Sequence, residues 1–306
     1  MSDRPPAEPD PDPAVPGPPA PADPVPPGFV RWRSDLTPPP EFWRAAGPQD
    51  EPDLDAPDEP TPPDLWQTVG GARPWGTLLL LFAWCLVFAV MGLRGEQGDS
   101  AAYRAWGSNL SSAQGWSDAW RLLAYTFLHG GTAHLFFNGL AMVVLGPAVE
   151  RVFTRAQFWL IFAAGGAASA LASQAWHRAT LPGVTASSIG ASGAIFALGG
   201  AMLAAAWRLR RRLPPSRARA LAGGLLPMLL QGLVAGFQKT GTDNPAHLGG
   251  LLAGLLLGLV LGLDPRLADR PLPRWAGAAG AAAALALLAA VAFGVYSGVT
   301  ASGASG

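Results

Sequence analysis

The chain has 306 residues, half of them hydrophobic, and its 21 basic and 21 acidic residues cancel to a net charge of zero. The charges are unevenly distributed along the chain. Residues 1–66 hold 14 acidic and 4 basic residues, together with 21 of the 31 prolines, and the remainder of the chain is basic. Neither part interleaves basic and aromatic residues as a nucleic-acid-binding surface requires, so we expect no nucleic-acid partner. The single cysteine, Cys85, excludes an internal disulfide.

The acidic segment, residues 1–66, is rich in proline and poor in β-branched residues. Such a segment buries too little apolar area to offset the entropy lost on ordering. It also lacks the apolar run of a cleavable signal peptide. We therefore expect residues 1–66 to form a disordered cytoplasmic tail.

Seven long uncharged segments follow the tail, each of them long enough to cross a bilayer. They are apolar on all faces and not along one stripe, which is typical of transmembrane helices and not of buried helices in a soluble protein. The chain is therefore predicted to be an all-α polytopic membrane protein. The expected spans are Pro74–Leu93, a span from near His134 to Val149, Ala156–Trp176, Ala179–Trp207, Ala220–Gln238, Asn244–Leu263 and Trp275–Tyr296.

The arginines give the orientation. Residues 208–219 carry six arginines and residues 266–274 carry three, and both stretches fall on the side of the tail. Because basic loops stay in the cytoplasm, we expect the N-terminus to be cytoplasmic and the helices to span the cell membrane. The 94–133 connection is then outside, and its three tryptophans indicate a segment that lies in the membrane interface.

One motif, Gly-Ala-Ser-Gly at 190–193, has two interpretations. Small residues beside Ser192 leave its hydroxyl uncrowded and a backbone N–H open, as a serine nucleophile requires. The same residues are typical of two membrane helices in close contact.

Three further polar residues favour the catalytic interpretation. His247, His134 and Asn138 lie near the same outer face as Ser192, and polar side chains at membrane depth are costly and usually functional. His134 and Asn138 are four residues apart and so share one helix face. In this hypothesis His247 takes the proton of Ser192, and the Ser192 N–H, the Asn138 amide and the His134 ring donate to an oxyanion. Gly-x-x-x-Gly after His247 would let span six approach span four.

These motifs resemble the rhomboid family of intramembrane serine proteases over about residues 75–265. The resemblance rests on Gly-Ala-Ser-Gly at 190–193, His-x-x-x-Asn at 134–138 and Ala-His-x-x-Gly-x-x-x-Gly at 246–254. Trp-Arg at 120–121 and the glycine-to-glutamate stretch at 146–150 add to it.

The resemblance implies a six-helix protease core at residues 67–265, followed by an additional transmembrane helix and a short tail at 266–306. It implies a serine endopeptidase with Ser192 as nucleophile and His247 as general base, without a carboxylate, cofactor or metal. His134 and Asn138 would stabilise the oxyanion, and Phe196 would lie against the catalytic ring. Arg121 and Glu150 would be structural. The substrates would be transmembrane segments of other proteins, cut near the outer face within the bilayer.

Two other functions remain as alternatives. The first is a catalytically silent rhomboid-like protein that binds transmembrane helices, against which the intact Ser192 and His247 argue. The second is a transporter, against which the clustering of polar residues at one face argues. Asp243 is expected to be a loop residue at the start of span six, and His129 and His177 to be loop histidines.

Overall fold

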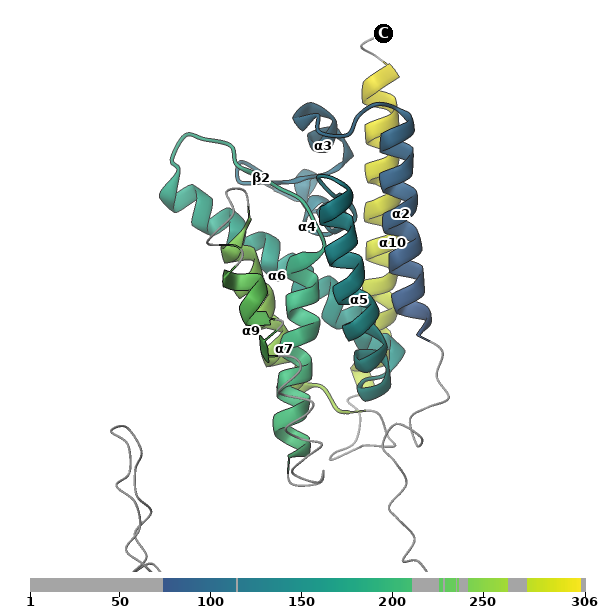
Figure 1. The fold of residues 1–306 in the computed structure, drawn as a ribbon, viewed down its shortest axis with the longest axis vertical. Helices are drawn as coiled ribbons and strands as arrows, with labels where there is room; N and C mark the ends of the chain where they lie inside the picture. The colour runs from purple at the N-terminus through teal and green to yellow at the C-terminus, as the bar shows by residue number, and fades with distance from the viewer. Residues whose placement is uncertain are drawn as a thin grey trace, which may run out of the picture. The chain divides into compact units, whose positions relative to one another are not determined.

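The structure is a computed structural model, and it describes the chain from residue 74 onward with gaps (Figure 1). The expected tail, residues 1–66, lies outside the described residues, as does most of the expected span 220–238. Within that span only residues 226–227, 229–234 and 236 are described, and they are helical. The described residues are 74–113, 115–210, 226–227, 229–234, 236, 242–263 and 274–303.

Within these ranges, five helices are long and apolar enough to cross a membrane. Each of them overlaps one of the expected spans, so the all-α polytopic architecture is confirmed. A sixth apolar helix, α9, has 17 residues and coincides with most of the expected span 244–263. The five are α2 (Trp75–Leu93), α5 (Thr132–Val152), α6 (Arg155–Thr180), α7 (Ser192–Leu209) and α10 (Arg274–Gly303), and α9 covers Asn244–Val260.

Short elements occupy the connection between α2 and α5, which we call the first loop (residues 94–131). One of them, β1, pairs antiparallel with β2, the strand that precedes α7, so that Asn109 lies opposite Ser188. The first loop is therefore hydrogen-bonded to the segment that leads into α7. The first-loop elements are α3 (Ser100–Trp106), β1 (Asn109–Leu110), η2 (Trp116–Asp118), α4 (Arg121–Ala124) and η3 (Tyr125–Phe127), and β2 is Ser187–Ser188, between α6 and α7.

The expected span Ala179–Trp207 is wrong in its first part. Helix α6 continues to Thr180, and the chain then turns through residues 181–191 before α7 begins at Ser192. The turn contains Gly183 at φ +80°, directly after a proline, and both residues interrupt helices. The segment looked like one span because it is free of charge. The same extension of α6 makes His177 a helical residue and not the expected loop histidine.

Glycines set the contact between α7 and α9. A Cβ atom at Gly250 would lie 2.0 Å from the carbonyl oxygen of Gly193, and one at Gly254 would lie 1.8 Å from that of Ala197. These separations are far below van der Waals contact, so the two backbones touch only because neither glycine has a side chain. The expected close approach of these two helices is confirmed.

Glu150 connects the C-terminal end of α5 to the N-terminal end of α2. Its buried carboxylate accepts hydrogen bonds from the backbone N–H of Gly76 at 3.0 Å and of Thr77 at 2.8 Å, and from the Thr77 hydroxyl at 2.7 Å. The carboxylate thus satisfies N–H groups that the first turn of α2 leaves unpaired. Glu150 is structural, as the sequence resemblance implies.

Candidate active site

Ser192 is the first residue of α7, directly after a sharp turn at Gly190. Gly190 has φ +120°, and a Cβ atom there would lie 2.6 Å from the His134 ring, so only glycine fits this position. The position of Ser192 has a chemical consequence. The first N–H groups of a helix have no acceptor within it, so they are available to an anion beside Ser192.

The structure brings Ser192 and His247 together from two helices. The Oγ atom of Ser192 lies 2.8 Å from Nε2 of His247, which is in the first turns of α9 and 5% exposed. Phe196, one turn after Ser192, stacks on the His247 ring with centroids 4.4 Å apart, as expected. In the neutral ring, an Nε2 that accepts the serine proton requires the ring proton on Nδ1. Within the described residues, Nδ1 of His247 has no hydrogen-bond partner.

Asp243 lies four residues before His247, yet its carboxylate points elsewhere. One oxygen accepts the backbone N–H of Ala246 at 3.0 Å and so caps the N-terminus of α9. The other accepts the hydroxyl of Ser173 on α6. In the described part of the chain it makes no hydrogen bond with the His247 ring, so these residues form a Ser–His pair without a third, carboxylate member.

His134 and Asn138 lie on α5, where both reach the turn before Ser192. A Cβ atom built on Gly190 would be 2.7 Å from Nε2 of His134 and 3.8 Å from Nδ2 of Asn138. Nδ1 of His134 accepts the backbone N–H of Gly130 at 3.3 Å, which leaves the proton of the neutral ring on Nε2. The buried Nδ2 of Asn138 has no partner among the described residues. Two N–H donors therefore converge beside Gly190, in the turn that leads to Ser192.

Sequence reasoning missed Tyr125, which fixes the turn before Ser192. Its carbonyl oxygen accepts the backbone N–H of Gly190 at 3.0 Å, and its buried hydroxyl donates to the carbonyl of Gly166 on α6 at 2.9 Å. The available signal was a tyrosine in the stretch between the Trp-Arg pair and His134, but composition alone does not reveal that it is buried.

His129 lies in the first loop, as expected, but only 1% of it is exposed. Its ring centroid is 5.2 Å from that of His134 and 5.5 Å from that of Trp84. Burial, with a smaller effect of His134, lowers the pKa of His129 to about 3. His129 is therefore neutral near pH 7, and its ring packs against the His134 ring. Among the described residues, no three histidine, cysteine or acidic side chains are grouped as metal ligands.

A family model for the rhomboid domain matches residues 117–264, a range that contains Ser192, His247, His134 and Asn138. The chain contains a rhomboid domain. Together with its apolar helices, the rhomboid domain makes it a multi-pass membrane protein. The expected domain limits at residues 67–265 and 266–306 stay predictions.

Several curated proteins named as rhomboids are similar to this chain. Rhomboid protease GluP of Bacillus subtilis is 33% identical over 59% of this chain and 33% of its own length. Rhomboid protease AarA of Providencia stuartii is 27% identical over 48% of this chain and 57% of its own. RHOMBOID-like protein 4 of Arabidopsis thaliana is 36% identical over 28% of this chain and 20% of its own. The chain thus spans between a fifth and somewhat over half of the length of these relatives.

Proposed function

We propose that this chain is a serine endopeptidase that cleaves transmembrane segments of other membrane proteins by a Ser192–His247 dyad. The observation that supports the proposal most is the 2.8 Å separation of Ser192 Oγ and His247 Nε2, from two helices with glycines at their contact. This is the distance at which a histidine can take the proton of a serine hydroxyl. Two relatives named as rhomboid proteases, GluP and AarA, support the same class.

The proposed reaction follows from the positions of these atoms. Ser192 Oγ attacks the carbonyl carbon of the scissile peptide while its proton passes to Nε2 of His247. The carbonyl oxygen becomes an oxyanion, which the Ser192 N–H, the Asn138 amide and Nε2–H of His134 stabilise. His247 returns the proton to the leaving amine, and a water molecule, activated by His247, hydrolyses the acyl-enzyme.

The substrate is proposed to be a transmembrane segment that unwinds locally. An intact helix keeps its peptide carbonyls hydrogen-bonded and surrounded by side chains, so a serine reaches a peptide bond only where the helix opens. Ser192, His134 and His247 all lie in the first turns of their helices, at one end of the helical body. By the positive-inside rule we assign this end to the extracytoplasmic side, because the two stretches richest in arginine, residues 208–219 with six and 266–274 with three, connect to the opposite ends of α7 and α10.

A catalytically silent protein that binds transmembrane helices is the second candidate. Such a protein has no need of a serine within hydrogen-bond reach of a histidine. The stacking of Phe196 on His247 and the two N–H donors on α5 are equally unnecessary for helix binding. The geometry therefore favours the protease.

The test is cleavage of a model single-pass membrane protein by the purified full chain in detergent. We expect the wild type to cut and Ser192→Ala and His247→Ala to lose cleavage while retaining their helical content. Ser187→Ala is the matched control: the Ser187 side chain is exposed, and the substitution leaves the backbone pairing of β1 with β2 in place, so the variant should cut at the wild-type rate. Cleavage by a folded Ser192→Ala variant would exclude the proposed mechanism.

A further inference from the structure

We infer that α10 is a positioning element of the candidate active site: it holds the first loop, and the first loop holds the residues that lead to Ser192. The inference rests on the proposed function. It concerns a helix that lies outside the residues matched by the rhomboid model, 117–264. Helix α10 contacts α6, α3 and α4 (Figure 1).

The first contact is between Trp106, at the end of α3, and two glycines of α10. A Cβ atom at Gly298 would lie 2.3 Å from Nε1 of the Trp106 indole, and one at Gly294 would lie 2.7 Å from the Trp106 carbonyl oxygen. Trp106 itself is 2% exposed. Because real Cβ atoms do not approach other atoms this closely, any side chain at Gly298 must displace either the indole or the helix.

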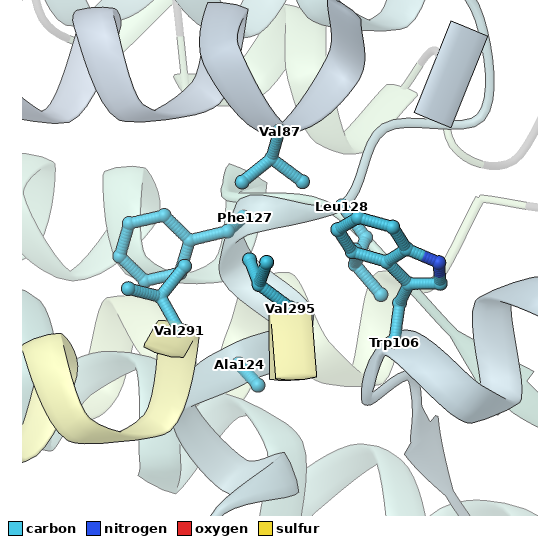
Figure 2. Close-up of a pocket in the computed structure, with 7 residues that line it drawn as sticks. All are labelled: Val87, Trp106, Ala124, Phe127, Leu128, Val291 and Val295. Atoms are coloured by element: carbon cyan, nitrogen blue, oxygen red, sulfur yellow. The ribbon is translucent and has the colours of Figure 1, made fainter. Parts of the chain in front are cut away.

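The second contact is apolar and extends along the same face of α10. Figure 2 shows side chains of α10 meeting those of the first loop and of α2 around a small apolar pocket. Next to it, the Phe293 ring meets the Trp120 ring edge to face, with centroids 4.9 Å apart. The lining residues are Val291 and Val295 from α10, Trp106, Ala124, Phe127 and Leu128 from the first loop, and Val87 from α2.

A series of polar contacts connects the first loop to the C-terminal part of α10. Nε1 of Trp106 donates to the Glu96 carboxylate at 2.7 Å, and Glu96 forms an ion pair with Arg94 at 2.8 Å. Arg94 also donates to the carbonyl oxygen of Val299 on α10 at 3.3 Å. Glu96 is 8% exposed, and a polar group buried to this extent needs such hydrogen-bond donors.

The first loop is in turn bonded to the segment before Ser192. The N–H of Gly190 donates to Tyr125, as described above, and β1 pairs with β2. Ser111 and Ala186 add two hydrogen bonds: the Ser111 N–H to the Ala186 carbonyl at 2.9 Å and the Ala186 N–H to the Ser111 hydroxyl at 2.8 Å. A shift of the first loop away from α10 therefore moves residues 186–190, which set the place of Ser192 against His247.

The test compares Gly298→Leu with Gly277→Leu in the full chain. Gly277 is on the same helix, but a Cβ atom there has no atom within 4 Å, so it is a matched control. The readouts are the rate at which a fluorophosphonate labels Ser192, kcat and KM for a model substrate, and the helical content by circular dichroism. We expect Gly298→Leu to lower the labelling rate and kcat at least tenfold, with KM within twofold and with helical content unchanged. Gly277→Leu should behave as the wild type.

A purely structural role for α10 would lower the yield or the melting temperature but leave the labelling rate of each folded molecule unchanged. Wild-type labelling of folded Gly298→Leu would thus overturn the inference and leave the proposed function intact. If Gly298→Leu does not fold, Phe293→Ala decides, since it removes one half-exposed ring from the interface and should slow labelling severalfold. Equal labelling of Phe293→Ala and the wild type would then overturn the inference. A folded wild type that is not labelled would remove the proposed function, and this inference with it.

Discussion

Phe196 and His247 stack face to face, with ring centroids 4.4 Å apart and ring planes 6° from parallel. Phe196 lies one turn after Ser192 on α7, so the stack ties the orientation of the imidazole on α9 to the helix that carries the serine. A ring held in this way keeps Nε2 directed at Ser192 Oγ without the carboxylate partner of a catalytic triad.

Replacing the stacking ring tests this relationship. An aromatic contact stabilises by roughly 1 kcal/mol, so we expect Phe196→Leu to lower kcat about fivefold, with KM close to the wild-type value. Steady-state cleavage kinetics measure both. Phe136→Leu, on the exposed face of α5, is the control. A Phe196→Leu enzyme with full kcat would show that the stack does not position the ring.

The glycine contact between α7 and α9 gives a second prediction. Gly250→Val must push α9 away from the Gly193 carbonyl, which the new Cβ atom would approach within 2.0 Å. We expect destabilisation of about 1–3 kcal/mol and loss of most activity, because the same movement separates Ser192 from His247. Thermal unfolding and cleavage assays measure the two effects.

Gly139→Val is the comparison for that experiment. A Cβ atom at Gly139 would make only an ordinary contact, 3.7 Å from Leu81, so this variant should keep both stability and activity. Equal behaviour of the two variants would contradict the account of the α7–α9 contact.

Replacing Asn138 is expected to lower activity without lowering stability. Its Nδ2 has no hydrogen-bond partner in the described part of the chain, so Asn138→Ala removes no hydrogen bond that this atom makes there in the resting protein. Removing one oxyanion donor typically lowers kcat by about 100-fold. We therefore expect Asn138→Ala to unfold near the wild-type temperature and to lose about 100-fold in kcat. A large loss of stability with kcat retained would instead assign Asn138 a structural role.

The buried His129 makes stability depend on pH. Its pKa is lowered to about 3 in the folded protein, whereas an unfolded histidine has a pKa of about 6.5. Below pH 6.5 the unfolded chain binds a proton that the folded chain does not, so folding stability falls as the pH drops from 6.5 towards 3.

His129→Phe should remove this contribution. We expect the melting temperature of the variant to depend less steeply on pH between 6.5 and 4 than that of the wild type, whatever its value at neutral pH. Identical slopes for the wild type and His129→Phe would contradict the burial argument.

The helices and the proximity of Ser192 and His247 could be predicted from patterns in the sequence. Uncharged length identifies a span, and the order of spans places residues 134, 192 and 247 at one face. Gly250 and Gly254 carried a spacing that predicts helix contact, and the contact is confirmed.

What the sequence could not predict depends on contacts between distant segments. The start of α7 was misplaced because absence of charge does not distinguish a span from an uncharged loop. Tyr125 and His129 are buried by α2, α5 and α6, which no pattern within residues 94–133 reveals. Likewise Gly298 and Gly277 are glycines of the same apolar helix, yet of the two only Gly298 contacts the first loop.

The most direct test of the dyad is covalent labelling of the folded full chain by a fluorophosphonate, with the adduct mapped by mass spectrometry. This measurement needs no substrate, so an unsuitable model substrate cannot obscure the result. The account predicts one adduct, on Ser192 in the wild type, and labelling at least 100-fold slower in His247→Ala. An unlabelled Ser192 in folded wild-type protein, or equal labelling without His247, would contradict it.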